Sequence, residues 1–173
     1  MKLILQTAKS AEFEEMYADY VTNHLSRYSS YYKENNFSRE ELIKEAQIYE
    51  NDENYDVYLI NNDSVTVGFA VISERVPACF SIAKSQAHIF EYYIKDEHSY
   101  KGYGQAAFRE ILGNVVPGKR ISLEILKSNS PALCFWRKCF DRNGLRYDCF
   151  IGVSTPEEEA ETDLYSVMPK FCS

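Results

Sequence analysis

Apolar spacing in the first third of the chain predicts one strand followed by two helices. Residues 3–7 (LILQT) form a short apolar run typical of a strand. From Ser10 onward, apolar side chains recur every three or four residues, which indicates a helix with one buried face. These positions are Phe13, Met16, Tyr17, Tyr20, Val21 and Leu25. Ser38 and Glu41 form a capping-box pattern that starts a second helix. We predict a loop between the helices, which carries Tyr28, Tyr31, Tyr32 and Phe37.

The middle of the chain alternates strand-like runs with turn signals. Residues 55–60 (YDVYLI) and 65–73 (VTVGFAVIS) predict two strands of a hairpin, because the intervening NNDS tolerates positive φ. Gly68 in the second run indicates a bulge. Residues 88–95 (HIFEYYIK) predict another strand, and residues 103–112 predict a helix that ends near Gly113.

The last third predicts three more strands and one more helix. Residues 120–125 read as a strand, and Ser130 before Pro131 predicts an N-cap with proline at the first helical position. That helix ends by residues 143–144 (NG), and residues 145–153 and 164–168 are closing strands. A second capping-box pattern lies between them at residues 155–158 (TPEE). The order β-α-α-β-β-β-α-β-α-β-β predicts a mixed α/β fold.

Composition is consistent with one folded domain over residues 1–173. The chain is 45% hydrophobic and 26% charged, and it contains no repeat or low-complexity linker. Its 26 acidic and 19 basic residues give a net charge of −7, which argues against a nucleic-acid binder. Cationic small molecules or basic peptides are the more favourable partners for such a surface.

Cysteine usage and hydropathy bear on metal binding and location. The five cysteines are an odd number without CxxC spacing, so they predict neither a disulfide framework nor a metal site: Cys79, Cys134, Cys139, Cys149 and Cys172. Reduced cytosolic thiols are the default for such a set. The apolar run at residues 3–5 is too short for a signal peptide, and no run approaches the ~18 apolar residues of a membrane span. We therefore expect a cytoplasmic protein that does not bind a membrane.

Residues 99–104 (SYKGYG), between a predicted strand and a predicted helix, are the strongest candidate for chemistry. Two glycines allow a tight turn in which successive N–H groups point into one concavity at the positive end of the helix. That geometry suits a pyrophosphate. A GxG alone is equally typical of a plain strand-to-helix turn. The segment matches neither the full GxGxxG dinucleotide pattern nor a Walker loop.

This segment resembles the acetyl-CoA loop of the GNAT superfamily, Gln/Arg-x-x-Gly-x-Gly/Ala after the fourth strand. Residues 123–125 (LEI), followed by Asn129-x-x-Ala132-x-x-Phe135-Trp136-x-x-x-Phe140, resemble the second motif of that family. The two motifs cover residues 88–140, and the predicted element order matches throughout. The resemblance implies a mixed, mostly antiparallel six- to seven-stranded sheet with helices on both faces. It also implies an acyl-CoA N-acyltransferase that transfers acetyl from acetyl-CoA to a primary amine.

The resemblance also assigns cofactor contacts by position. Tyr92, Tyr93 and Ile94 would present backbone groups to the pantetheine arm. The backbone amides that would hold the pyrophosphate are those of Ser99, Tyr100, Lys101, Gly102, Tyr103 and Gly104. Asn129 matches the asparagine that binds pantetheine, and Ala132 would keep its helix close to the cofactor.

Two positions depart from the family pattern. Ser99 replaces the usual Gln or Arg, which removes a long polar contact. Trp136 replaces the tyrosine with which many members protonate the leaving thiolate, and an indole N–H cannot act as an acid. Tyr147 and Cys134 are the nearby candidates for that proton. The alternative for Cys134 is a small apolar group packed on its helix, and the alternative for Tyr147 is a half-buried core residue on a strand. Solvent could also protonate the thiolate of a thiol whose pKa is about 8.5.

Direct attack by an amine requires a base, because an ammonium has no lone pair. His88 is the preferred candidate, since its ordinary pKa is about 6.5 and its position matches a Glu or His base of some family members. A hydrogen-bonded histidine at a strand start is the structural alternative. Glu91 points to the face of the strand opposite to that of His88, and Glu124 lies on the next strand. Both are further candidates, with a solvated carboxylate as the alternative.

The acceptor side of the family lies between the first two strands. Here that region combines the four aromatic residues of the predicted loop with Glu34, Glu40, Glu41 and Glu45, a combination that suits a cation. An acidic solvated helix explains the same residues without function. A non-catalytic acyl-CoA-binding sensor or interaction module is the alternative function, favoured by Ser99 and Trp136. Residues 145–153 could pair with a second chain in a homodimer.

Overall fold

A computed structural model describes residues 3–7, 10–76, 78, 83–151 and 162–169. The chain forms two compact units. The first unit comprises Met1–Ile72 and Glu91–Ala107, and the second comprises Ser73–Phe90 and Phe108–Ser173. Strand β4 (Ala87–Ile94) contributes its first half to the second unit and its second half to the first. The capping-box pattern at residues 155–158, Cys79 and Cys172 lie outside the described residues.

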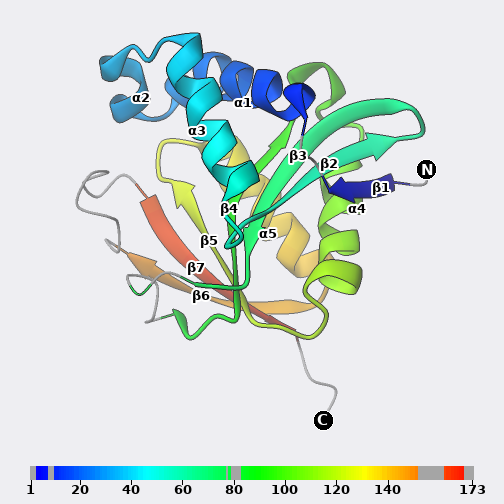
Figure 1. The fold of residues 1–173 in the computed structure, drawn as a ribbon. Coiled ribbons are helices and arrows are strands. Elements are labelled where there is room, and N and C mark those ends of the chain that lie inside the picture. The colour runs from blue at the N-terminus through cyan, green and yellow to red at the C-terminus, as the bar shows by residue number, and fades with distance from the viewer. Residues whose placement is uncertain (1–2, 8–9, 77, 79–82, 152–161, 170–173) are drawn as a thin grey trace. The chain divides into compact units, whose positions relative to one another are not determined.

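The strands of the first unit follow the order β1-β2-β3-β4 (Figure 1). Strands β1 (Leu3–Thr7), β2 (Asp56–Asn62) and β3 (Val65–Ser73) pair antiparallel, as the hairpin prediction requires. Asp63 takes a left-handed conformation, with φ of 55°, at the hairpin tip. The predicted hairpin is therefore confirmed, and its tip carries a residue type that tolerates this backbone.

Gly68 allows two strands of the first unit to approach more closely than any side chain permits. Ile60 pairs with Gly68 while Asn61 pairs with Thr66, so a bulge lies beside Gly68, as predicted. A Cβ atom at Gly68 would lie 2.1 Å from the carbonyl oxygen of Tyr93 in β4. Glycine is required here for close backbone approach as well as for the bulge.

Helices α1 (Ala11–Asn23) and α3 (Arg39–Asn51) confirm the two predicted helices and their caps. The Ser10 side chain accepts from the Phe13 N–H, and the Ser38–Glu41 capping box has both of its reciprocal hydrogen bonds. Aromatic rings join α1 to β3: the centroid of Phe69 lies 5.2 Å from that of Phe13. The apolar positions predicted for this helix are buried, so its periodicity correctly predicted the core.

The predicted loop between these helices is wrong in part. It contains a 3-10 turn η1 (Leu25–Arg27) and a short helix α2 (Ser30–Asn35). Ser29 caps α2 by accepting from the Tyr32 N–H, and Asn36 ends it in a left-handed conformation, with φ of 52°. A helix of six residues is too short to show an apolar repeat, so only its polar caps signal it.

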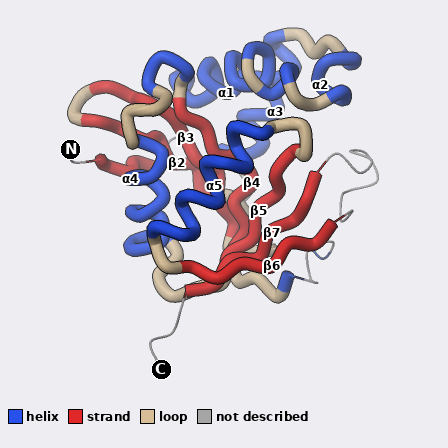
Figure 2. The backbone as a smooth tube through the Cα atoms, turned by 180° about the vertical axis from the view of Figure 1, so that it is seen from behind, coloured by secondary structure: helices blue, strands red, loops and turns tan. Residues whose placement is uncertain are grey.

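The second unit arranges its strands in the order β4-β5-β7-β6. Strand β5 (Ile121–Leu126) pairs parallel with β4, whereas β7 (Thr162–Pro169) pairs antiparallel with both β5 and β6 (Leu145–Ile151). Figure 2 shows β7 between β5 and β6. The mixed α/β class with mostly antiparallel pairing is therefore confirmed.

Two predicted helix ends in the second unit are wrong. Helix α5 (Ser130–Arg142) is capped by Asn129 rather than Ser130, because the Asn129 Oδ1 atom accepts from the Ala132 N–H at 3.0 Å. Helix α4 (Tyr103–Glu110) continues into a π-helical turn (Ile111–Val115) instead of ending near Gly113. Gly113 keeps a negative φ there, so it does not supply the left-handed backbone of a helix stop.

Replacing Gly68 with alanine is expected to destabilise the protein by about 2–3 kcal/mol, because the added methyl group overlaps the Tyr93 carbonyl oxygen. Urea denaturation would measure the loss. Gly113→Ala is the matched control, since a Cβ there meets nothing within 4 Å and lies in a helical turn. Equal midpoints for the two variants would contradict the close approach at Gly68.

Candidate active site

The segment between β4 and α4 has the backbone shape expected of an anion-binding loop. A 3-10 turn η3 (Asp96–His98) leads to Ser99, whose N–H donates to the Asp96 carbonyl at 3.1 Å. Tyr100 and Gly102 both have positive φ, 61° and 86°, directly before α4. Left-handed residues that alternate with an ordinary one turn their amides toward one side. The first N–H groups of α4 add to these amides, because a first helical turn has no internal acceptors for them.

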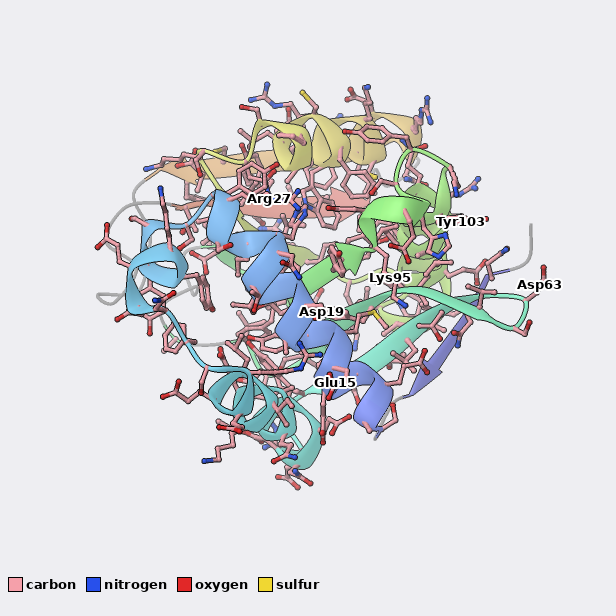
Figure 3. The ribbon with its side chains drawn as sticks, turned by 90° about the horizontal axis from the view of Figure 1, so that it is seen from above. Glu15, Asp19, Arg27, Asp63, Lys95 and Tyr103 are labelled. Carbon is pink, nitrogen blue, oxygen red and sulfur yellow. The ribbon has the colours of Figure 1, made fainter. Side chains whose placement is uncertain are left out.

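The start of α4 is fixed to strands of the first unit. The Tyr92 hydroxyl donates to the Gly104 carbonyl at 2.5 Å, and Asn62 Nδ2 lies 3.4 Å from the Tyr103 hydroxyl. Figure 3 shows Tyr103 at this helix start and Lys95 at the beginning of the connection. Gly102 lies in open space, with nothing within 4 Å of a built Cβ atom. The loop is therefore anchored at its ends and accessible at its centre.

The backbone of β4 divides the predicted pantetheine contacts into two sets. The Lys95 N–H donates to Val67 in β3 at 2.9 Å, and the Tyr93 carbonyl lies against Gly68 in the same strand. Backbone groups of alternate strand residues point to the same edge. The polar groups of Tyr93 therefore face β3, whereas those of Tyr92 and Ile94 point to the other edge.

His88 lies in the second unit, and its side chain is only 1% exposed. Its Nδ1 atom shares a hydrogen bond of 2.8 Å with Ser122 Oγ, which lies 2.7 Å from Ser85 Oγ. Burial lowers the pKa of His88 from 6.5 to about 3, because desolvation penalises the charged imidazolium. The imidazole is thus neutral at physiological pH and a weak proton acceptor. This environment favours the structural alternative, and the catalytic role of His88 stays a prediction.

Glu91 lies in the first unit, near the buried Tyr17 and Tyr20 of α1 and the half-buried Tyr49 of α3. Tyr20 donates a side-chain hydrogen bond to Glu91, and its ring centroid lies 4.9 Å from that of Tyr93. Burial, and secondly the Glu91 carboxylate, raise the pKa of Tyr17, Tyr20 and Tyr49 well above the ordinary value. These hydroxyls remain protonated donors, so this face of β4 combines a carboxylate with aromatic rings.

The remaining predicted residues lie in the second unit. Glu124 accepts from the Thr162 hydroxyl at 2.7 Å. Trp136 is 6% exposed and packs edge-on against Phe108, with ring centroids 5.1 Å apart. Tyr147 is 38% exposed on β6, with one face toward Phe140. The indole of Trp136 thus belongs to an aromatic core, as expected of a residue that has no acid role.

The environments of Asn129 and Cys134 bear on the roles predicted for them. The Asn129 side-chain oxygen accepts from the Ala132 N–H, so a cofactor contact would use its amide nitrogen or the second lone pair of that oxygen. Cys134 is exposed on α5, whereas its structural alternative was a small apolar group packed on that helix. The role predicted for Asn129 is thus compatible with its capping role.

One cluster of titratable groups in the first unit was not predicted from the sequence. His24 Nδ1 lies 3.4 Å from Asp96 Oδ1, and Arg27 Nη2 lies 3.2 Å from Asp96 Oδ2. Residues 24 and 96 are far apart in the chain and belong to no shared motif. Only the fold brings them together, beside the start of the candidate loop.

The model of the acetyltransferase (GNAT) family matches residues 2–141. The chain belongs to the GNAT acetyltransferase family. This agrees with the loop geometry and confirms the resemblance drawn from its two motifs. No match is found among the curated proteins.

Solved structures show the same fold as this GNAT acetyltransferase at low sequence identity. An acetyltransferase from Thermus thermophilus is 17% identical over 98% of this chain and 97% of that chain, with a TM-score of 0.65. A spermidine N-acetyltransferase chimera from Vibrio cholerae and hSSAT is 12% identical over 98% of this chain and 96% of that chain, with a TM-score of 0.63. A Bacillus subtilis acetyltransferase in complex with CoA is 12% identical over 97% of each chain, with a TM-score of 0.58.

Among the residues that the structure describes, no group of three or more His, Cys, Asp or Glu side chains could hold a metal ion. Within the same residues, no helix has the length and apolar character needed to cross a membrane.

The buried His88 predicts how the stability of this GNAT acetyltransferase depends on pH. Its folded pKa of about 3 lies below the ordinary 6.5, so the unfolded state binds more protons between these values. We expect this group to reduce the unfolding free energy by up to about 1.4 kcal/mol per pH unit as pH falls from 6.5 toward 3. Urea titrations at several pH values should show a smaller slope for His88→Gln.

The control for this experiment is Val65→Ala. Val65 is half exposed on β3, and its substitution removes no titratable group, so the slope should stay in place. A wild-type slope retained by His88→Gln would show that His88 does not have the low pKa.

Proposed function

We propose that this GNAT acetyltransferase transfers an acetyl group from acetyl-CoA to a primary amine by direct attack within a ternary complex. The observation that carries the proposal is the left-handed backbone at Tyr100 and Gly102 immediately before α4. It creates a concave row of N–H donors at a helix N-terminus, which is the environment that a pyrophosphate prefers. Family membership supplies the chemistry for which such a loop is used.

The donor side of the proposal uses the backbone. Amides from Tyr100 to Gly104 would bind the pyrophosphate, because the Ser99 N–H already donates to the Asp96 carbonyl. The short Ser99 side chain leaves these backbone contacts in place. Backbone groups of Tyr92 and Ile94 would bind the pantetheine arm and polarise the thioester carbonyl, since they point away from β3. Such fixed dipoles stabilise the negative charge that develops on the carbonyl oxygen in the transition state.

The acceptor side is proposed to be the face of β4 that carries Glu91 and Tyr93. A carboxylate among aromatic rings attracts a cation, and the net charge of −7 favours cationic acceptors in general. Polyamines, aminoglycoside-like amines, amino acids and protein N-termini all carry the required primary amine. A structural relative that acetylates spermidine is consistent with this class, although its low identity supports only the fold.

Release of the thiol does not require a side-chain acid in this proposal. Trp136 is packed among aromatic rings and cannot donate a proton to sulfur. A thiol of pKa about 8.5 is a good leaving group, so the thiolate can be protonated by solvent or by the attacking amine. Tyr147, which is partly exposed, remains the candidate side chain if an acid takes part.

A non-catalytic acyl-CoA-binding module is the second candidate, favoured by the tryptophan at position 136. Thiol release measured across a panel of amines separates the two functions. Turnover that depends on the amine and exceeds background hydrolysis excludes the sensor. Acetyl-CoA binding without turnover on any amine of the panel supports it.

Location and assembly are part of the same proposal. We infer a cytoplasmic protein, where acetyl-CoA is available and exposed thiols such as Cys134 stay reduced. Strand β6 carries the exposed residues 146–149 and pairs with β7 alone in the described sheet order, so a second copy could add to its other edge. Light scattering of the purified protein would test for such a homodimer.

Gly102→Glu is expected to weaken acetyl-CoA binding by roughly thirtyfold, about 2 kcal/mol, because it places a carboxylate beside the proposed pyrophosphate site. Isothermal titration calorimetry would measure the dissociation constant. Gly118→Glu is the matched control, because Gly118 also has positive φ and open space around a Cβ atom. Unchanged binding by the folded Gly102 variant would refute the loop assignment.

Glu91→Gln should raise KM for a cationic amine about tenfold, because a charged hydrogen bond becomes a neutral one. The amide still accepts from Tyr20, so packing is preserved. The KM for acetyl-CoA should not change in the same assays. A rise in KM for acetyl-CoA alone would place Glu91 on the donor side instead.

A further inference from the structure

His24 lies in an enclosed but accessible environment at the end of α1. Three tyrosine rings surround its imidazole: Tyr20 stacks at 5.8 Å between centroids, Tyr93 lies at 5.4 Å and Tyr28 at 5.5 Å. The side chain is 25% exposed, whereas its Nδ1 atom is fully buried. The exposed surface therefore belongs to the other side-chain atoms, and Nε2 is the ring nitrogen that can contribute to it.

Asp96 connects His24 to the candidate cofactor loop. Its Oδ1 atom lies 3.4 Å from His24 Nδ1, and its carbonyl accepts from the Ser99 N–H at the start of the loop. Its Oδ2 atom lies 3.2 Å from Nη2 of Arg27, a residue of η1 that is labelled in Figure 3. One carboxylate thus lies within ion-pair distance of the imidazole, without a hydrogen bond to Nδ1, and belongs to the same turn that begins the loop.

This arrangement determines the tautomer and basicity of the imidazole. A carboxylate beside Nδ1 favours a proton on that atom, which leaves the lone pair on Nε2. Burial lowers the pKa of His24 from 6.5, Asp96 acts in the opposite direction, and Arg27 adds to the lowering. The ring is therefore neutral near pH 7, and its conjugate acid has a carboxylate partner.

We propose that His24 is the general base that removes a proton from the incoming ammonium group, with Asp96 as the residue that positions its ring. This inference rests on the proposed function. It is supported by the contact of His24 with Tyr93, which lies between the two β4 residues proposed to hold the thioester. The surrounding aromatic faces also favour an ammonium group beside the base.

The proton balance of this step is complete without another reactant. The ammonium gives one proton to His24 Nε2, and the neutral amine then attacks the thioester carbonyl carbon. A C–N bond forms as the C–S bond breaks, and the second amine proton goes to the thiolate. The imidazolium finally returns its proton to solvent, so the products are the amide, free CoA and one released proton.

The test compares three histidine variants over a range of pH. We expect His24→Gln to reduce kcat/KM for the amine by about 100-fold and to remove the acid limb of the pH profile, with the acetyl-CoA dissociation constant unchanged. His88→Gln and His98→Gln should retain the acid limb. Asp96→Asn should move that limb to lower pH, because the imidazolium loses its carboxylate partner.

Several outcomes would overturn the proposal. A His24 variant that keeps the wild-type rate and acid limb rejects the base assignment and leaves the proposed function intact. Loss of the limb in His88→Gln alone transfers the role to His88. A wild-type protein that releases no thiol with any amine rejects both the function and the base. If His24→Gln does not fold, NMR titration of His24 in the wild type replaces the kinetic test. A His24 pKa different from the pKa of the acid limb excludes His24 as the base.

Discussion

The close contact between Gly68 and the Tyr93 carbonyl is the constraint on which the candidate site of the first unit depends. It fixes where β4 lies against β3. The Lys95 N–H then donates to the Val67 carbonyl of β3, directly before the chain enters η3. The end of β4 thereby sets the position of the loop residues that follow it. A side chain at position 68 would shift β4 and with it the row of amides that follows. The absence of a side chain thus contributes as much to the site as the polar groups do.

The tyrosines of α1 have two roles that usually conflict. They form the core between the helix and β3, and they also carry hydroxyl groups that must be satisfied when they are buried. The Tyr20 hydroxyl donates to Glu91, and this hydrogen bond offsets part of the desolvation cost of a carboxylate among aromatic rings. The same packing encloses His24 on the next turn. An acceptor face built in this way is rigid, because moving any of its polar groups would disturb the core.

Local signals made much of the fold predictable from the sequence, and their absence explains the errors. The capping box at Ser38, the hairpin and the glycine-containing loop each depend on residues within a few positions of one another. The errors arise where two local signals compete, as for Asn129 and Ser130, or where a helix of six residues has no periodicity. The candidate site divides in the same way. Its loop was predictable from glycine spacing, whereas the pairing of His24 with Asp96 and the burial of His88 are tertiary properties.

The contrast between two histidines shows why residue type and motif position do not identify a base. His88 matches the family position, but the Ser122 hydroxyl bonded to its ring carries no charge to offset burial of an imidazolium. His24 matches no motif. Burial lowers its pKa, the Asp96 carboxylate raises it, and Arg27 lowers it again. A general base must accept a proton readily and also lose it again near the working pH. His24 combines burial, which lowers its pKa, with a carboxylate that opposes this shift, an arrangement suited to accepting a proton and releasing it again.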